Sequence, residues 1–153
     1  MAAEREVKPL ECNCAAIRHA ARHVTQHYDG HLAAVGLRTT QFSILVKLRR
    51  LGPLTINGLA GHMGMDRTTL GRNILPLERD GLITIEKGAA DQRSKELHIT
   101  KAGVERMRAG LKHWTAAQAG YEQAVGPQRA SQLRALLGAV VASDLSAAAD
   151  EAR

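Results

Sequence analysis

The chain has 153 residues, of which 44% are hydrophobic, 24% charged and only 3% aromatic. This length suits one domain with an attached assembly surface, and the composition indicates an aliphatic, alanine-rich core of packed helices. The formal net charge of +6 and the pI near 9.8 favour an anionic partner. There is neither an apolar run of the roughly 20 residues that a membrane span needs nor a signal-peptide pattern, so we expect a cytoplasmic protein.

The first 36 residues are expected to form an arm and one long helix. Residues 1–10 have no hydrophobic periodicity, which predicts a flexible or strand-like arm, with Pro9 marking the entry to a helix. From Cys14 to Val35 the apolar residues step by three and four, which predicts an amphipathic helix that ends at Gly36.

A second helix is expected to follow at once. Thr39 or Thr40 can cap it, and Gly52-Pro53 should stop it. Its predicted inner face consists of Phe42, Leu45, Leu48 and Leu51. Lys47, Arg49 and Arg50 on the same helix can contact phosphate groups or can simply be solvated surface.

Two short amphipathic helices are predicted between residues 55 and 81. Thr55 can cap the first, which Gly64 ends, and Asp66 can cap the second, which Gly81 closes. Two helices joined by a short turn that contains glycine are typical of a helix-turn-helix, whose second helix enters the major groove of DNA. Pro76 lies inside the second helix and is expected to bend or loosen its last turns.

A β-hairpin is expected directly after these helices. Residues 82–85 and 96–100 are short, alternating runs rich in β-branched residues, and a polar segment from Lys87 to Lys95 separates them. Such a long tip tends to be functional or disordered, and its Lys87, Arg93 and Lys95 suit a wing that lies along DNA. The sequence therefore predicts a mostly α-helical fold with a small β-hairpin, the winged helix-turn-helix.

The polar face of the second short helix carries residue types that suit DNA. Arginine pairs with guanine, asparagine with adenine, and threonine contacts phosphate or the thymine methyl group. The predicted DNA-binding residues are Arg67, Thr68, Thr69, Arg72, Asn73, Lys87, Asp91, Arg93 and Lys95. The alternative is a solvated helix face of ordinary polar residues. Residues 54–103 hold seven Lys and Arg against six Asp and Glu, so the winged region is not a basic block and its case depends on where the arginines lie.

Two further helices are expected after the hairpin. Thr100 can cap a long one whose apolar residues, from Val104 to Val125, follow a near-heptad pattern that suits packing against another helix. Gly126-Pro127 breaks the chain before an Ala- and Leu-rich helix with Leu133, Leu137, Val140 and Leu145. These helices have more apolar surface than a lone winged domain needs, which predicts a homodimer with half-sites about 10 base pairs apart. The alternative is a monomer that folds the helices onto itself.

In order and spacing, five segments of the chain resemble the multiple-antibiotic-resistance regulator (MarR) family of dimeric winged-helix transcription factors. They are the QFxxL segment from Gln41 to Leu45, the LAxxMGMDRTTLxR segment from Leu59 to Arg72, LERDGLI from Leu77 to Ile83, the DxR of Asp91 and Arg93, and LHITKAG from Leu97 to Gly103.

The resemblance implies a transcriptional repressor that binds a palindromic double-stranded DNA operator. It implies that Thr68, Thr69 and Arg72 meet the major groove, that Arg93 reaches the minor groove and that Asp91 helps to hold the wing. It also implies release from DNA by a small aromatic ligand or by oxidation. No cofactor is expected.

The expected domain organisation follows from these elements. Residues 1–36 form an arm and helix of the dimerisation region, residues 37–100 the winged DNA-binding domain, and residues 101–153 the C-terminal dimerisation helices.

Three other groups of residues can carry chemistry. The only cysteines, Cys12 and Cys14, are expected to be thiols, and Cys14 lies where peroxide-sensing members of the family place a cysteine, although inert packing is the alternative. His19, His23, His27 and His31 repeat along one helix face and with Cys14 can bind zinc or copper, or can form a polar edge. The predicted effector pocket consists of Tyr28, His31, Phe42, His113 and Trp114, for which core packing is the alternative.

Two competing classes of function are weighed against DNA binding. An enzyme that uses nucleophilic catalysis would need a nucleophile, a base and an oxyanion site. Cys14 near His19 is the only pair in the sequence that suggests such a nucleophile and base. A winged helix used for protein contacts would make the basic wing incidental. Salt-sensitive DNA binding distinguishes the regulator from both.

Overall fold

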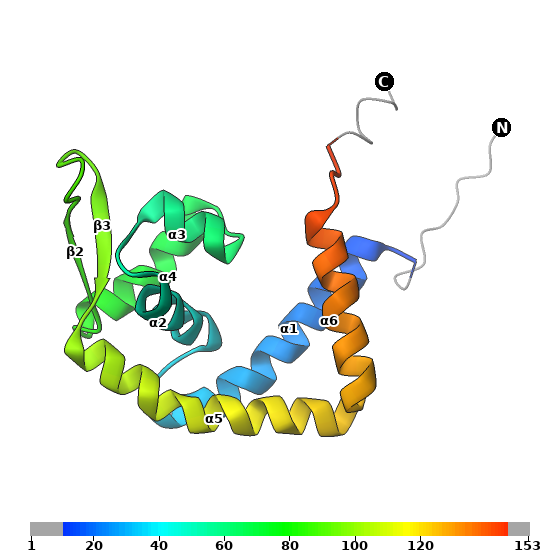
Figure 1. The fold of residues 1–153 in the computed structure, drawn as a ribbon. Coiled ribbons are helices and arrows are strands. Elements are labelled where there is room, and N and C mark those ends of the chain that lie inside the picture. Colours follow the sequence, from blue (N-terminus) through cyan, green and yellow to red (C-terminus); the bar gives the residue numbers. More distant parts are fainter. Residues whose placement is uncertain (1–10, 147–153) are drawn as a thin grey trace. The chain divides into compact units, whose positions relative to one another are not determined.

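A computed structural model describes residues 11–146, and the predicted arm of residues 1–10 lies outside them. The elements in order are the helix α1 (Asn13–Leu32), the 3-10 turn η1 (Ala33–Val35), α2 (Thr39–Leu51), β1 (Leu54–Thr55), α3 (Ile56–Met63), α4 (Arg67–Arg79), β2 (Ile83–Lys87), β3 (Lys95–Ile99), α5 (Lys101–Val125) and α6 (Pro127–Ala142). The prediction of a mostly helical winged helix-turn-helix is confirmed (Figure 1).

The chain divides by its internal contacts into one unit that ends at Ala117 and another that begins at Gln118. The first contains α1 to β3 and the first part of α5, and the second contains the rest of α5 and α6. The three predicted domain ranges stay a prediction.

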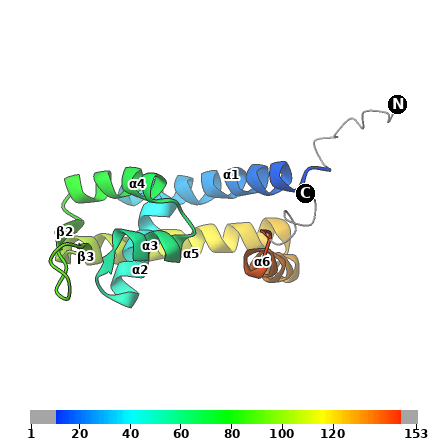
Figure 2. The ribbon, with the colours of Figure 1, turned by 90° about the horizontal axis from the view of Figure 1, so that it is seen from above.

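A three-stranded antiparallel sheet of order β1-β3-β2 lies at the base of the wing. The hairpin pairs Ile83 with Ile99, and β1 pairs Leu54 with Leu97 on the other side of β3. The sequence predicted the hairpin but not β1, because two residues are too few to show an alternating pattern. Figures 1 and 2 show the hairpin beside α2, α3 and α4.

One aliphatic core holds α2, α3, α4 and the sheet together. Its fully buried side chains include Leu45 from α2, Leu59 from α3, Leu70 from α4 and Leu97 from β3. All four are leucines at the helical or strand spacing that the sequence showed, so the apolar periodicity correctly predicted which faces of these elements are buried. Leu51 is the exception: it was expected to face inward, but it lies in the last turn of α2 and is 47% exposed.

Several helix ends fall where the sequence predicted them. Thr55 caps α3, Asp66 caps α4, and Gly64 ends α3 in the left-handed region at φ 63°. The hydroxyl of Thr100 accepts the Gly103 N–H at 3.0 Å and donates to the Gly81 carbonyl at 2.7 Å, so it caps α5 and ties that helix to the end of α4.

Three details of the helix ends differ from the prediction. Arg38, not Thr39 or Thr40, is the cap of α2, because the Gln41 and Asp29 side chains accept the N–H groups of Arg38 and Thr39. The first helix ends at Leu32, and one 3-10 turn precedes Gly36. Leu145 lies beyond α6, which ends at Ala142.

Pro76 does not end α4. The helix continues to Arg79, and the carbonyl of Pro76 accepts the Asp80 N–H at 3.0 Å. Proline has no amide to donate, but the chain stays helical on both sides of it, so the residues before it keep their helical spacing.

Gly103 lies where the start of α5 packs tightly against Leu82 and Ile99. It is buried, and a Cβ atom there would collide with the carbonyl oxygen of Leu82 and lie 2.8 Å from Ile99. Gly61 in α3 is also helical, but it is exposed and would have nothing within 4 Å of a Cβ atom.

We therefore expect Gly103→Ala to lower the free energy of unfolding by about 1–3 kcal/mol, because the backbone at the start of α5 must move. The matched control Gly61→Ala should raise it by roughly 0.5–1 kcal/mol, since alanine favours an open helical position. Urea unfolding followed by circular dichroism measures both. Equal effects of the two substitutions would show that this contact does not restrict the packing.

Candidate nucleic-acid interface

The N-terminal end of α4 is fixed by a strong local cap. The Asp66 carboxylate accepts the Thr69 N–H at 2.8 Å and the Thr69 hydroxyl at 2.6 Å. The hydrogen bond from the Thr69 hydroxyl, and then that from its backbone, holds the pKa of Asp66 below the ordinary value of 3.8. The first turn of α4 is thus held by a carboxylate that stays ionised, which also suits the positive end of the helix dipole.

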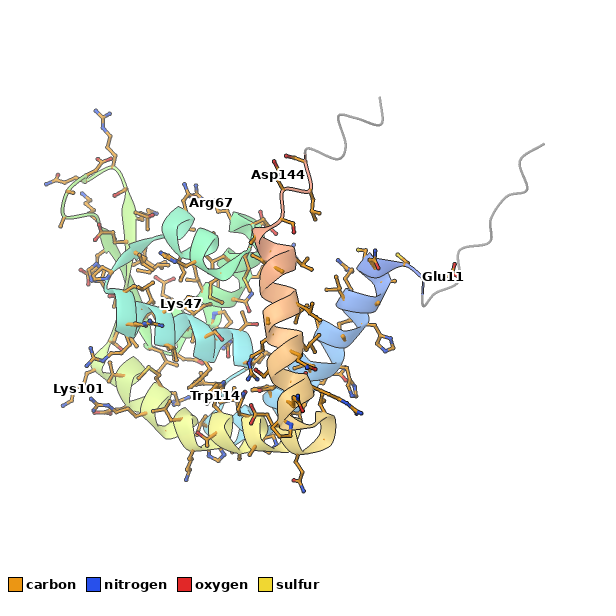
Figure 3. The ribbon with its side chains drawn as sticks, turned by 45° about the vertical axis from the view of Figure 1, so that its right-hand side comes forward. Glu11, Lys47, Arg67, Lys101, Trp114 and Asp144 are labelled. Carbon is orange, nitrogen blue, oxygen red and sulfur yellow. The ribbon has the colours of Figure 1, made fainter. Side chains whose placement is uncertain are left out.

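The predicted base-reading residues of α4 divide into two groups. The Thr69 hydroxyl donates to Asp66, and the Asn73 amide donates to the Thr69 carbonyl at 2.9 Å, so both are engaged within the helix. Arg67, Thr68 and Arg72 are exposed, and their side chains form no hydrogen bond or ion pair with the described part of the chain. Figure 3 shows Arg67 at the outer surface of the molecule. These three have their polar groups available to a ligand.

The wing tip is closed by its own hydrogen bonds. Asp91 accepts the Arg93 N–H through its side chain at 2.9 Å and the Ser94 N–H through its backbone at 3.0 Å. The Gly88 N–H donates to the Ser94 carbonyl at 2.9 Å. These bonds hold the tip while the Arg93 side chain stays exposed, as do those of Lys87 and Lys95.

Two glutamates of the wing are turned toward a histidine. Glu86 and Glu96 lie opposite each other on β2 and β3, and their carboxylates lie 3.7 and 3.6 Å from Nε2 of His98. Glu96 is one-fifth exposed, whereas the wing's basic side chains are exposed. The Glu86 side chain is 58% exposed and Asp91 is also exposed, so the three cations of the wing surface outnumber its exposed carboxylates by one.

A groove joins the start of α4 to the wing. Its volume is about 410 Å³, and we call it the basic groove; it is lined by Thr55, Ile56, Asn57, Arg67, Arg93, Ser94 and Lys95. The pairing of Thr55 with Glu96 between β1 and β3 places the first turn of α3 beside the base of the wing. The groove thus combines three cationic side chains with the N-terminal end of a helix, which is a favourable environment for phosphate oxygens.

Sequence reasoning identified the three cations of this groove but missed Asn57 and Ser94. Recognising the strand β1 in the sequence would have indicated these two residues, because β1 positions α3 against the wing. Lys87 and Asp91 do not line the groove.

The predicted effector residues are dispersed among different surroundings. Phe42 is buried in the core, while Trp114 is 38% exposed. Tyr28 and His31 lie on α1 in edge-on contact with His27, at ring distances of 5.6 and 5.0 Å.

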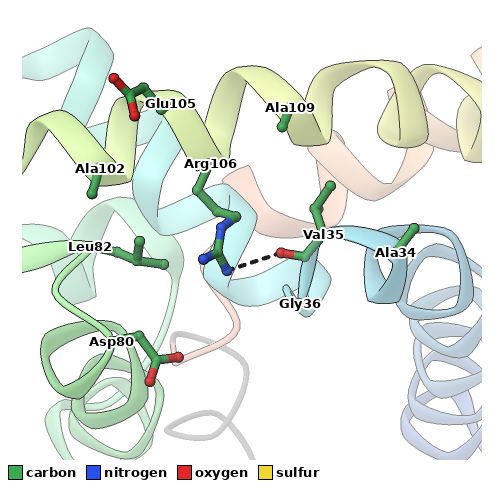
Figure 4. A pocket seen from close by; sticks show the side chains of 9 residues that line it. All are labelled: Ala34, Val35, Gly36, Asp80, Leu82, Ala102, Glu105, Arg106 and Ala109. Carbon is green, nitrogen blue, oxygen red and sulfur yellow. Dashed lines mark hydrogen bonds between the residues drawn. The ribbon is translucent and has the colours of Figure 1, made fainter.

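A separate cavity of about 610 Å³ lies between η1, the turn after α4 and the start of α5, and its lining contains none of the five predicted effector residues (Figure 4). In it, Arg106 donates to the Val35 carbonyl at 3.1 Å.

The two cysteines lie at the start of α1. Cys12 caps the helix, with its sulfur accepting the Ala15 N–H at 3.4 Å, and Cys14 is exposed.

The histidines of the predicted row have different surroundings in the structure. His19 and His23 are exposed, whereas His27 is partly buried and its Nε2 lies 2.8 Å from the Ala117 carbonyl oxygen. Within residues 11–146, no group of three or more His, Cys, Asp or Glu side chains is arranged to hold a metal ion.

The described part of the chain contains no helix that is long and apolar enough to cross a membrane.

The fold and this surface define a winged helix-turn-helix protein, and comparisons with known proteins identify its family. The model of the MarR family matches residues 37–95. The M. tuberculosis transcriptional regulator MosR is 34% identical, with coverage of 87% of this chain and 98% of that one and a TM-score of 0.73. The same regulator in complex with DNA is 36% identical, with coverage of 86% and 98% and a TM-score of 0.73. The chain belongs to the MarR family and is a transcriptional regulator.

A curated relative agrees with this assignment. The HTH-type transcriptional regulator YwoH of Bacillus subtilis (strain 168) is 31% identical over 85 residues, which make up 56% of this chain. The chain spans 61% of the length of that relative.

The cap of α4 leads to a prediction about stability and pH. Because the pKa of Asp66 is lowered in the folded state, its ionised form stabilises the fold above the pKa of the unfolded chain. That contribution is lost as the pH falls through the folded-state pKa. Asp66→Ala should therefore melt below the wild type at pH 7, and the gap should close below about pH 4. Melting curves from pH 7 to 3 measure this, and a gap that stays constant over the whole range would contradict it.

Proposed function

We propose that this protein is a homodimeric repressor that binds a palindromic double-stranded DNA operator and leaves it when a small aromatic ligand binds or when it is oxidised. The observation that carries the proposal is the basic groove, in which Arg67, Arg93 and Lys95 meet beside the exposed face of α4. The complex of MosR with DNA supports it, since that relative is 36% identical over nearly its whole length.

In this proposal α4 enters the major groove and the wing follows the DNA backbone. Thr68 and Arg72 reach base edges, because their side-chain polar groups have no partner within residues 11–146. Thr69 and Asn73 stabilise the helix itself. Thr69 forms the cap together with Asp66, and Asn73 donates to the Thr69 carbonyl. Lys87 and Lys95 neutralise phosphates, Arg93 extends from the tip into the minor groove, and Asp91 holds the tip.

The proposed dimer is supported by apolar side chains that the single chain leaves exposed. In the first unit these are Ile17, Leu111 and Trp114, at 43, 45 and 38% exposure. In the second unit α6 exposes Leu133, Leu136, Leu137, Val140 and Val141. A two-fold dimer buries such surface and presents two copies of α4 to half-sites about 10 base pairs apart.

Release from DNA is proposed through two inputs. An aromatic ligand would bind near Tyr28, His31, Phe42, His113 and Trp114, of which Trp114 is accessible from solvent. Oxidation would act at Cys12 or Cys14, and the Cys12 sulfur at the first turn of α1 links its chemical state to the start of that helix. Both inputs stay predictions of the sequence.

A regulator that acts by binding DNA needs no catalytic group, and none is part of this proposal. We also propose a cytoplasmic location, because that is where a regulator of this kind meets chromosomal DNA.

Substitution of the DNA-facing arginines tests the proposed interface. Arg72→Ala should weaken operator binding and reduce base discrimination by on the order of 1–3 kcal/mol, and Arg93→Ala should weaken it without unfolding the protein. Fluorescence anisotropy with a duplex selected from random DNA, over a salt series, measures both. Arg108→Ala on the exposed side of α5 is the control and should bind as the wild type does. Equal affinity of all four proteins would rule out the assigned surface.

Light scattering tests the dimer independently of DNA. The proposal expects twice the 16.5 kDa mass of the chain at micromolar concentration. Replacing Leu133 and Leu137 together with glutamate should shift the mass toward the monomer, because charge would be placed on an apolar surface. A wild-type protein with the mass of a single chain would contradict the proposal.

A further inference from the structure

Leu75 is an apolar side chain on the face of α4 that points away from the core. The core-facing residues Leu70, Ile74 and Leu77 are at most 3% exposed, whereas Leu75 is 63% exposed. Successive residues of a helix turn by about 100°, which places Leu75 about 100° from Ile74, about 140° from Leu70 and about 160° from Leu77, on the side of α4 away from the core. Its side chain therefore contributes little to the folding of the winged domain.

Leu75 belongs to a line of exposed residues along the helix. We call this line the outer stripe; it consists of Thr68, Arg72, Leu75 and Arg79. The spacing of four, three and four residues keeps all of them on one side of α4. Thr68 and Arg72 are the proposed base-reading residues, so Leu75 continues the same surface by one further turn.

The immediate surroundings of Leu75 favour a nucleic acid as the occupant of this surface. A shallow cavity of about 550 Å³ is lined by Leu75 and Pro76 with Arg72, Glu78 and Arg79. The two arginines lie one turn to either side of Leu75, and Arg79 is partly neutralised by Asp80 at 3.1 Å. Glu78 adds a negative charge at the same end as Arg79, so Arg72 is the cation of this lining that has no acidic partner among the described residues. A partner that fits places an apolar group on Leu75 beside a negative charge for Arg72. The major groove of DNA does so where the 5-methyl group of a thymine lies between the two phosphate backbones.

We propose that Leu75 contacts the 5-methyl group of a thymine and so adds a base preference that the arginines do not supply. This inference rests on the proposed function, in which α4 enters the major groove. Leu75 is seven residues beyond Thr68, or about 10.5 Å along the helix at 1.5 Å per residue. If α4 lies along the groove, that length is roughly three base pairs at 3.4 Å each. The thymine therefore lies about three base pairs from the one that Thr68 meets.

Replacing thymine with deoxyuridine tests the contact, because it removes the methyl group and leaves base pairing unchanged. The probe is a palindromic duplex that the wild-type protein selects from random-sequence DNA. Each thymine is replaced in turn, symmetrically in both half-sites, and affinity is measured by fluorescence anisotropy. At one position the wild type should lose about fourfold in affinity per half-site, as expected for one buried methyl group.

The variant Leu75→Ala should bind the thymine duplex more weakly and should show no loss at that position. Leu51→Ala is the matched control, since Leu51 is an exposed leucine at 47% on another helix, and it should keep the wild-type uracil profile. Circular dichroism is expected to show the same helix content in all three proteins, because both leucines are exposed.

Each other outcome overturns the inference in an identifiable way. A wild-type protein that prefers its selected duplex but is insensitive to uracil, or whose profile Leu75→Ala leaves unchanged, rules out the methyl contact and leaves the proposed function standing. A Leu75→Ala protein with unchanged DNA affinity and an altered mass in light scattering would assign the surface to protein contacts instead. Failure to select any sequence from the random pool would overturn the proposed function and this inference together.

Discussion

The pairing of β3 on both of its edges is the constraint on which the winged domain depends. β3 pairs with β2 to make the wing and with β1 to fix the start of α3, and its Leu97 is fully buried in the core. One short strand therefore decides where the wing stands relative to both helices of the helix-turn-helix. The pairing of Thr55 with Glu96 brings the first turn of α3 to the groove that Arg67 of α4 shares with Arg93 and Lys95 of the wing.

Around this frame, local hydrogen bonds decide which polar groups remain available to a partner. Asp66 and Thr69 fix the first turn of α4, Asp91 closes the wing tip, and two glutamates of the hairpin turn toward His98. These contacts give four carboxylates partners within the domain. The arginines and lysines stay at the surface, which explains how a region of nearly balanced charge can present a basic interface.

The interface that results is not uniformly polar. Arg67 belongs to the basic groove beside the wing, while Arg72 belongs to the outer stripe that includes Leu75. A surface of this kind can separate two tasks, in which cations near the wing supply affinity for the backbone and the outer stripe discriminates between bases. α4 stays helical through Pro76, so the members of the stripe keep their helical spacing.

The sequence by itself determined the helices, their caps at Thr55, Asp66 and Thr100, the hairpin and the cationic residues of the wing. Each of these depends on neighbours within a few positions, so periodicity and capping chemistry express them directly. Only the tertiary structure decided that Arg67, Arg93 and Lys95 share a groove with Asn57, that Thr69 and Asn73 are engaged within α4, and that Leu75 stays outside the core. These features depend on the two-residue strand β1 and on side-chain geometry, because contacts between segments distant in sequence leave no local pattern in the chain.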